Sequence, residues 1–129
     1  MILRAVVLKM GVEFVGGFMR QHILGLTVTG KIDRPLGSSH PDYPDLVYKI
    51  NYGFVDGIMG GDGQEQDAYI LGANEPLESF EGKVIAIYHR THDVEDKWIV
   101  SLDDKIYSDE EILQAIQFQE QYYEGILVR

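Results

Sequence analysis

The sequence predicts a mainly β protein of the α+β class: a five-stranded antiparallel barrel with a C-terminal helix. Three observations support this prediction. Short segments rich in strand-forming residues recur along the chain, turn residues that include all four prolines separate them, and one helical pattern appears near the end. A closed barrel leaves no free sheet edge, so it accommodates five short strands joined by long loops. In architecture such a barrel is OB-like.

The five strands are expected at residues 23–30, 46–54, 67–72, 83–90 and 97–101. Each is rich in β-branched or aromatic residues, which favour extended structure. In the first, Thr27 alternates with Leu26 and Val28, which predicts that the two apolar side chains face the core. In the second, Tyr48 and Tyr52 share one face.

The helix is expected within residues 108–123. Ser108 is an N-cap residue, and Glu111 three positions later completes a capping box. One face at helical spacing carries Ile112, Ala115, Ile116, Gln119 and Tyr123.

Length and composition limit the classes of protein to which the chain can belong. Its 129 residues suit one domain, and 45% apolar with 25% charged residues is typical of a globular protein. The net charge of -10 disfavours nucleic acid and anionic membranes as partners. The chain has no cysteine, which excludes disulfides and thiolate metal sites and fits a reducing, cytoplasmic location.

The first 20 residues are expected to be either a translated leader or an additional N-terminal strand, and the barrel domain covers residues 21–129. The apolar run from Ala5 to Leu8 is interrupted by Lys9, and no small-residue cleavage site follows it. These features argue against a signal peptide. Met19 or Met10 is a candidate start, because consecutive glycine codons before Met19 can contain a ribosome-binding sequence.

Two acidic segments lie next to predicted strands. Asp62, Glu65 and Asp67 surround the turn that leads into the third strand, and "HDVEDK" at 92–97 precedes the fifth. Carboxylate oxygens are the ligands that Mg²⁺ prefers, usually one or two of them together with waters and phosphate oxygens. A metal site is one interpretation of these acids, and a solvated acidic turn is the other.

Four short motifs follow one another along the chain: "YKINYGF" at 48–54, "DGQEQD" at 62–67, "HDVEDK" at 92–97 and "FQEQYY" at 118–123. In this order they resemble the family I soluble inorganic pyrophosphatases of the β-barrel class. "DRPLGSSHP" and "FQEQYY" resemble in particular a short bacterial pyrophosphatase-like branch. The likeness spans residues 26–124. It implies hydrolysis of inorganic pyrophosphate to two phosphates with Mg²⁺, or alternatively Mn²⁺, as cofactor, by a water that the metal activates.

The resemblance also implies a role for individual residues. The metal ligands would be Asp62, Asp67, Asp93, Glu95 and Asp96. Tyr52 and Lys97 would act in catalysis together with Asp67, and substrate would be bound by Arg34, His40, Tyr48 and Tyr122. The expected partner is a small diphosphate, and we also expect a homo-oligomer.

Two positions depart from the family pattern. The middle acid of the metal loop is Gln64, and an amide cannot act as a general base. Glu65 lies on the same side of an extended segment as Asp67, so we expect it to take this role. A lysine of the family is replaced by Tyr123. These changes leave open two alternatives: hydrolysis of another diphosphate, such as a nucleotide or sugar diphosphate, and a non-catalytic barrel that binds diphosphate.

Overall fold

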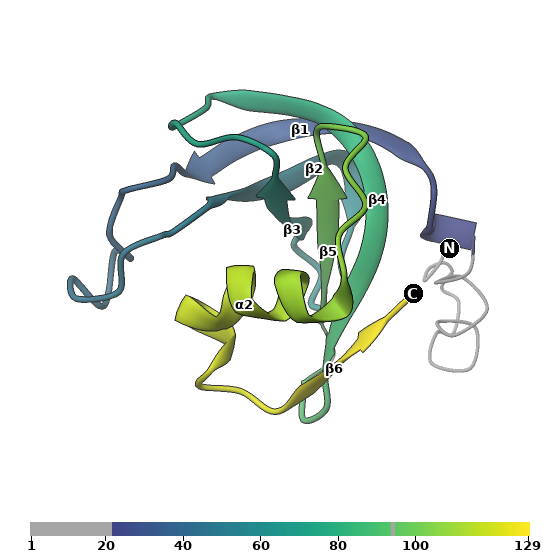
Figure 1. Ribbon diagram of the computed structural model, residues 1–129. Coiled ribbons are helices and arrows are strands. Elements are labelled where there is room, and N and C mark those ends of the chain that lie inside the picture. Colours follow the sequence, from purple (N-terminus) through teal and green to yellow (C-terminus); the bar gives the residue numbers. More distant parts are fainter. Residues whose placement is uncertain (1–21, 94) are drawn as a thin grey trace.

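The long strand β4 closes the sheet into a barrel (Figure 1). The computed structural model describes residues 22–93 and 95–129, so the expected leader or extra strand at 1–20 lies outside the described residues. The elements are β1 (Thr27–Arg34), β2 (Asn51–Met59), β3 (Glu65–Leu71), β4 (Ser79–Arg90), β5 (Asp96–Ser101), α2 (Asp109–Glu120) and β6 (Gly125–Val128). The order β1-β2-β3-β5-β4 closes through a β1–β4 pairing, and β6 pairs with the far end of β4.

The predicted fold class, a mainly β barrel of five strands with one helix, is confirmed, but the barrel is mixed rather than wholly antiparallel. β3 and β5 are parallel, with Ala68 opposite Trp98 and Leu71 opposite Ser101. The reason is the chain order. β4 follows β3 in sequence and runs in the opposite direction, and β5 then returns antiparallel to β4 and pairs between the two. β5 therefore runs in the same direction as β3. Residue patterns report which segments are strands, but not which strands become neighbours.

Both faces of the central strands are buried. Tyr69 and Ile99 belong to one apolar cluster, whereas the adjacent Ile70 and Val100 belong to a second. Helix α2 contributes Ile112 and Ile116 to the first cluster and so covers that face of the sheet. Burial on two sides explains why β3 and β5 have continuous apolar runs rather than alternating ones.

Strand β2 begins later than the sequence suggests, at Asn51, whose side chain forms hydrogen bonds to two neighbouring loops. Its Oδ1 accepts hydrogen bonds from the backbone N–H groups of Leu36 and Leu77, each at 3.0 Å, and its Nδ2 donates to the Glu75 carbonyl at 2.9 Å. The side chain is fully buried. Asn51 thus holds together two loops far apart in sequence, and residues 46–50 remain outside β2.

Helix α2 has the predicted capping box. The Ser108 hydroxyl accepts from the Glu111 backbone N–H at 3.1 Å, and Glu111 Oε1 accepts from the Ser108 N–H at 2.9 Å. Of the residues predicted to share one helix face, Gln119 is buried, whereas Tyr123 lies beyond the helix end and is 48% exposed. Among the described residues, no helix has the length and apolar character needed to cross a membrane.

Candidate functional site

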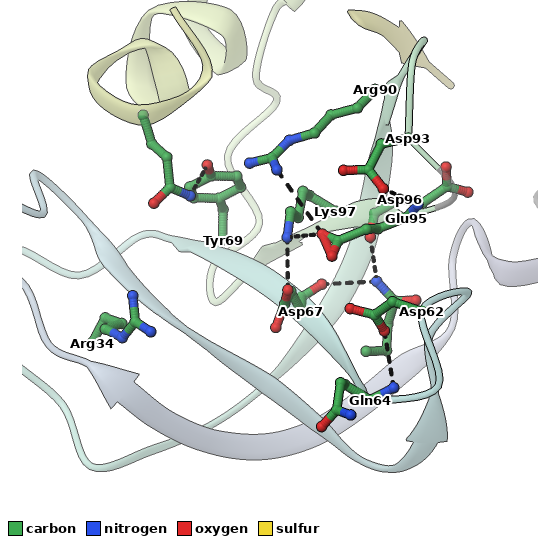
Figure 2. A network of polar contacts seen from close by, with 12 residues as sticks. Arg34, Asp62, Gln64, Asp67, Tyr69, Arg90, Asp93, Glu95, Asp96 and Lys97 are labelled. Carbon is green, nitrogen blue, oxygen red and sulfur yellow. Dashed lines mark hydrogen bonds and ion pairs between the residues drawn. The ribbon is translucent and has the colours of Figure 1, made fainter. Parts of the chain in front are cut away.

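Lys97 lies between carboxylates from separate segments of the chain (Figure 2). Its Nζ donates to Asp67 Oδ2 at 2.7 Å and to Glu95 Oε1. The local cause is the parallel pairing of β3 with β5, which opposes Ala68 to Trp98 and so sets the preceding residues, Asp67 and Lys97, side by side. Lys97 is only 3% exposed. We refer to Asp62, Asp67, Glu95 and Lys97 as the acid cluster.

Electrostatics link Asp62 to this group. Burial raises the pKa of Glu95, Lys97 lowers it, and contact with the Asp62 carboxyl raises it again, with a net upward shift. Burial alone would lower the pKa of Lys97, but Tyr52, Asp67 and Glu95 outweigh burial and raise it. Lys97 is therefore a permanent cation, and it compensates carboxylates that would otherwise repel one another.

Tyr52 and Asp33 border the acid cluster. Lys97 Nζ lies 5.8 Å from the centre of the Tyr52 ring, and burial raises the pKa of this tyrosine, with smaller effects of Lys97 and Asp67. The phenol, which is protonated at neutral pH like any tyrosine, is thereby held in its neutral form to still higher pH and can donate a hydrogen bond. Burial also raises the pKa of Asp33, which Arg34 lowers and Asp67 raises. Four acidic side chains thus contribute negative charge to one small region.

A second polar network connects β1 to helix α2. Arg34 donates to the Tyr48 hydroxyl at 2.8 Å, and that hydroxyl donates to Gln119 Oε1 at 2.7 Å. Gln119 Nε2 in turn donates to the Tyr69 hydroxyl at 2.6 Å, which donates to Glu120 Oε2 at 2.5 Å. Tyr48 and Tyr69 are almost wholly buried, so these bonds hold α2 in place over the sheet.

Arg90 joins the two networks. Its guanidinium donates to both oxygens of Glu120, at 2.9 Å and 2.7 Å, and its Nη1 lies 4.0 Å from Glu95 Oε1. The Tyr123 ring covers the guanidinium, with 3.7 Å from Cζ to the ring centre. Figure 2 shows the guanidinium directed toward Glu95 and Lys97. Two cations therefore flank the Glu95 carboxylate.

The sequence analysis did not identify Arg90 or Glu120. A signal for Glu120 is present, because it follows Ile112 and Ile116 at helical spacing and therefore lies on the face that packs on the sheet. A buried glutamate requires a cationic partner. The sequence alone does not say which arginine or lysine provides it.

Three residues of the predicted site lie apart from Lys97. Asp96 Oδ1 is 2.8 Å from His89 Nδ1, because successive residues of β5 point to opposite faces. Asp93 Oδ1 accepts from the Glu95 backbone N–H at 3.3 Å and thereby shapes the turn before β5. Glu65 is exposed, and its side chain forms no hydrogen bond or ion pair with any described residue. Its role as a general base stays a prediction.

His40 and Tyr122, both predicted to bind substrate, lie around a separate pocket beside α2. The His40 ring stacks 6.5 Å from the Tyr48 ring, and Tyr122 is 68% exposed. Arg34 lies 5.8 Å from the centre of the Tyr48 ring and is the one predicted phosphate-binding cation besides Lys97. Their roles in substrate binding also remain predictions.

The described residues contain no group of three or more His, Cys, Asp or Glu side chains arranged to hold a metal ion. Lys97 stands between Asp67 and Glu95 in the place where a shared cation would bind. The contact between Asp62 and Glu95 nevertheless brings two carboxyl groups together. Such a pair fits Mg²⁺, which commonly takes one or two carboxylates and completes its coordination with water and phosphate oxygens. It does not fit an ion that needs a cage made wholly of protein ligands.

Solved structures of three bacterial inorganic pyrophosphatases are similar to the chain. The protein from Ehrlichia chaffeensis has a TM-score of 0.58 at 16% identity, over 79% of this chain and 85% of that one. The chain shares the fold of the inorganic pyrophosphatases. The Helicobacter pylori protein has a TM-score of 0.56 at 17% identity, with coverage of 80% and 84%. The Neisseria gonorrhoeae protein has a TM-score of 0.55 at 20% identity, over 78% of this chain and 75% of that one.

The pyrophosphatase-like fold confirms, at the level of structure, the resemblance carried by the four motifs. No family model and no curated protein matches the sequence. At identities of 16–20% the similarity concerns the fold alone, and function has to be argued from the site.

Proposed function

We propose that the chain hydrolyses inorganic pyrophosphate bound as a complex with Mg²⁺. The observation that carries the proposal is the convergence of Asp62, Asp67 and Glu95 around Lys97, in a barrel that shares the pyrophosphatase fold. Three acids from two loops and a strand carry more negative charge than the single cation Lys97 compensates, and the excess charge is repulsive. A cation that binds them offsets this cost.

In the proposed mechanism, Asp62 and Glu95 would hold the cation, and Asp67, paired with Lys97, would add negative charge beside them. When bound, Mg²⁺ neutralises charge on the diphosphate and makes a neighbouring water more acidic. Glu65 would accept a proton from the attacking water, whose oxygen bonds to phosphorus while the bridging P–O bond breaks and the second phosphate leaves. Lys97 and Arg34 supply positive charge to the phosphate groups.

The buried phenols have a defined part in the same scheme. Tyr52 lies beside Lys97, and burial raises the pKa of its phenol above the ordinary value, so the phenol stays protonated despite the neighbouring cation. It can therefore donate a hydrogen bond to a phosphate oxygen without competing as an anion. The Tyr48 hydroxyl is already engaged with Arg34 and Gln119, so its effect is to orient the Arg34 guanidinium. Tyr122 is exposed and lines the separate pocket beside α2, so it has no part in this scheme.

A second candidate is a barrel that binds diphosphate without hydrolysing it. Lys97 is paired with two carboxylates and Arg90 with Glu120, which reduces the positive charge available to stabilise a leaving phosphate. Gln64 replaces an acid of the family pattern and is exposed. Hydrolysis of an organic diphosphate is the remaining alternative.

The test is release of phosphate from pyrophosphate with and without millimolar Mg²⁺. We expect Mg²⁺-dependent release, and we expect Asp67→Asn to abolish it while the far-ultraviolet circular dichroism stays unchanged. Asp104→Asn is the matched control, because Asp104 is exposed and outside the acid cluster. Full activity of Asp67→Asn would refute the metal assignment. Binding of pyrophosphate without phosphate release would favour the non-catalytic candidate.

A further inference from the structure

An open pocket of about 560 Å³ lies between the loop at residues 40–46 and the end of helix α2. The loop contributes His40, Asp42, Tyr43 and Asp45, and the helix end contributes Tyr122 and Tyr123. Figure 1 shows the two segments that meet there, the loop that follows β1 and the turn from α2 to β6. The volume falls in the range of sites for small organic ligands.

The pocket is unusual in the exposure of its aromatic side chains. Tyr43 is 66% exposed, Tyr122 68% and Tyr123 48%. Two of these rings contact a neighbouring side chain. The ring centres of Tyr43 and His40 are 5.1 Å apart, and the Tyr123 ring lies against the Arg90 guanidinium. The pocket is thus lined by three exposed tyrosines, two of which are held in place by neighbouring side chains. Exposed aromatic surface of this kind is typical of a binding site.

The charge of the pocket restricts the ligand. Neither Asp42 nor Asp45 forms an ion pair with any residue in the described part of the chain. The nearby His40 uses its Nδ1 to accept a hydrogen bond from the Asp42 backbone N–H at 3.0 Å, and it forms no ion pair with either carboxylate. The pocket is therefore negative, and it disfavours a phosphate or another anion.

We propose that this pocket binds an organic cation of the alkylammonium class. The faces of tyrosine rings attract cations, and the attraction is greatest where the cation is partly desolvated. Asp42 and Asp45 compensate the ligand charge from the rim. A neutral ligand of the same shape would gain the apolar contacts but neither of these electrostatic contributions. The proposal does not rest on the proposed hydrolysis of pyrophosphate.

The test compares choline with 3,3-dimethylbutan-1-ol, its neutral analogue of the same shape, by isothermal titration calorimetry at constant ionic strength. We expect choline to bind at least about tenfold more tightly than the neutral alcohol, since rings and carboxylates each favour the charge. Equal affinities for the two ligands, or no binding of choline at concentrations up to about 10 mM, would overturn the proposal. Neither ligand carries phosphate, so the outcome is independent of the pyrophosphatase assay.

Variants then assign the binding to this pocket. Tyr122→Leu should weaken choline about threefold or more, because it removes a ring and keeps an apolar side chain. Asp45→Asn should weaken choline but not the alcohol, whereas the control Asp104→Asn should leave both unchanged. Both altered residues are exposed, so the folded state should be retained, as melting curves can verify. Choline affinity that is unaltered in both Tyr122→Leu and Asp45→Asn would refute the assignment.

Discussion

Lys97 compensates the negative charge around it and is, at the level of single residues, the centre of the candidate site. Its side chain is 4% exposed, whereas those of its partners Asp67 and Glu95 are 32% and 20% exposed. Water therefore reaches the carboxylates but hardly reaches the ammonium group. The pairing costs Lys97 its own hydration and is favourable only because two acids share the cation.

Replacing this lysine should destabilise the protein. We expect Lys97→Met to lower the free energy of unfolding by about 2 kcal/mol, below the roughly 3–5 kcal/mol of fully buried pairs because the two carboxylates can still hydrate. Urea unfolding measures the change. Lys105→Met is the control, because the Lys105–Glu111 pair is exposed and should contribute less than about 1 kcal/mol. Equal stability of Lys97→Met and the parent chain would contradict the compensating role.

The residue that activates water can be tested at positions 64 and 65. If the chain hydrolyses pyrophosphate and Glu65 is the base, Glu65→Gln should reduce kcat by roughly 10²- to 10⁴-fold with little change in the Mg²⁺ concentration required. Gln64→Asp should raise kcat, because it restores an acid of the family pattern. Steady-state kinetics with pyrophosphate decides the matter, and an unchanged kcat in Glu65→Gln would exclude Glu65.

Helix α2 depends, at the level of elements, on contacts at both of its ends. The capping box at Ser108 satisfies N–H groups of the first turn, and the pairing of Glu120 with Arg90 attaches the last turn to β4. Gln119 adds hydrogen bonds to Tyr48 and Tyr69. The helix thus brings polar groups into the interior only at its C-terminal end, where the two polar networks meet.

The N-terminal end of this helix should make stability depend on pH. Hydrogen bonding to the Ser108 backbone and the nearby Lys105 lower the pKa of Glu111 below its ordinary value of 4.5. A lowered pKa in the folded state stabilises the fold fully above pH 4.5, and the effect is lost as the pH falls through the folded value.

We therefore expect the parent chain to melt at a higher temperature than Glu111→Gln at pH 7, and the difference to shrink as the pH is lowered below 4.5. Thermal melts followed by circular dichroism measure it, and Gln is the suitable replacement because it keeps an oxygen that can accept the Ser108 hydrogen bond. Ser108→Ala, which removes the N-cap oxygen, should cost about 1 kcal/mol at both pH values. A difference that persists unchanged at low pH would contradict this assignment of charge.

The net charge of -10 governs the behaviour of the whole molecule. Self-repulsion of this size weakens the compact state, so any salt should raise the melting temperature by screening. Specific binding adds a further increase through mass action on the native state. The two contributions can be separated because screening depends on ionic strength, whereas binding depends on the particular ion and ligand.

We expect Mg²⁺ with pyrophosphate to raise the melting temperature more than NaCl of equal ionic strength. Differential scanning fluorimetry is sufficient to measure the difference, with Asp67→Asn as the control that retains nearly the same net charge but lacks one carboxylate of the acid cluster. Equal shifts with the two salts would mean that Mg²⁺ acts by screening alone, and would count against a metal site.

Local rules account for much of the fold. The capping box at Ser108 was predicted correctly because it depends on residues three positions apart. The five barrel strands were found from apolar, strand-forming runs, but two of them were misplaced: β2 begins at Asn51 and not at residue 46, and β1 is Thr27–Arg34 and not 23–30. Leu26, predicted to face the core, therefore precedes β1 and is 46% exposed. The short strand β6 was missed, since its four residues have no pattern of their own and become a strand by pairing with β4. Asp62, Asp67, Glu95 and Lys97 were predicted as site residues from the order of the motifs.

By itself, the sequence determined the mainly β barrel, the capped helix, the excess of negative charge and the acidic residues of the candidate site. The tertiary structure decided which of those residues meet: the parallel pairing of β3 with β5 sets Asp67 beside Lys97, and α2 brings Glu120 to Arg90. It also separated Asp96 from the acid cluster and placed His40 and Tyr122 around a different pocket. The physical reason is that turns, caps and strand propensity depend on neighbours in the chain, whereas ion pairs and pockets depend on the order and direction in which strands pair.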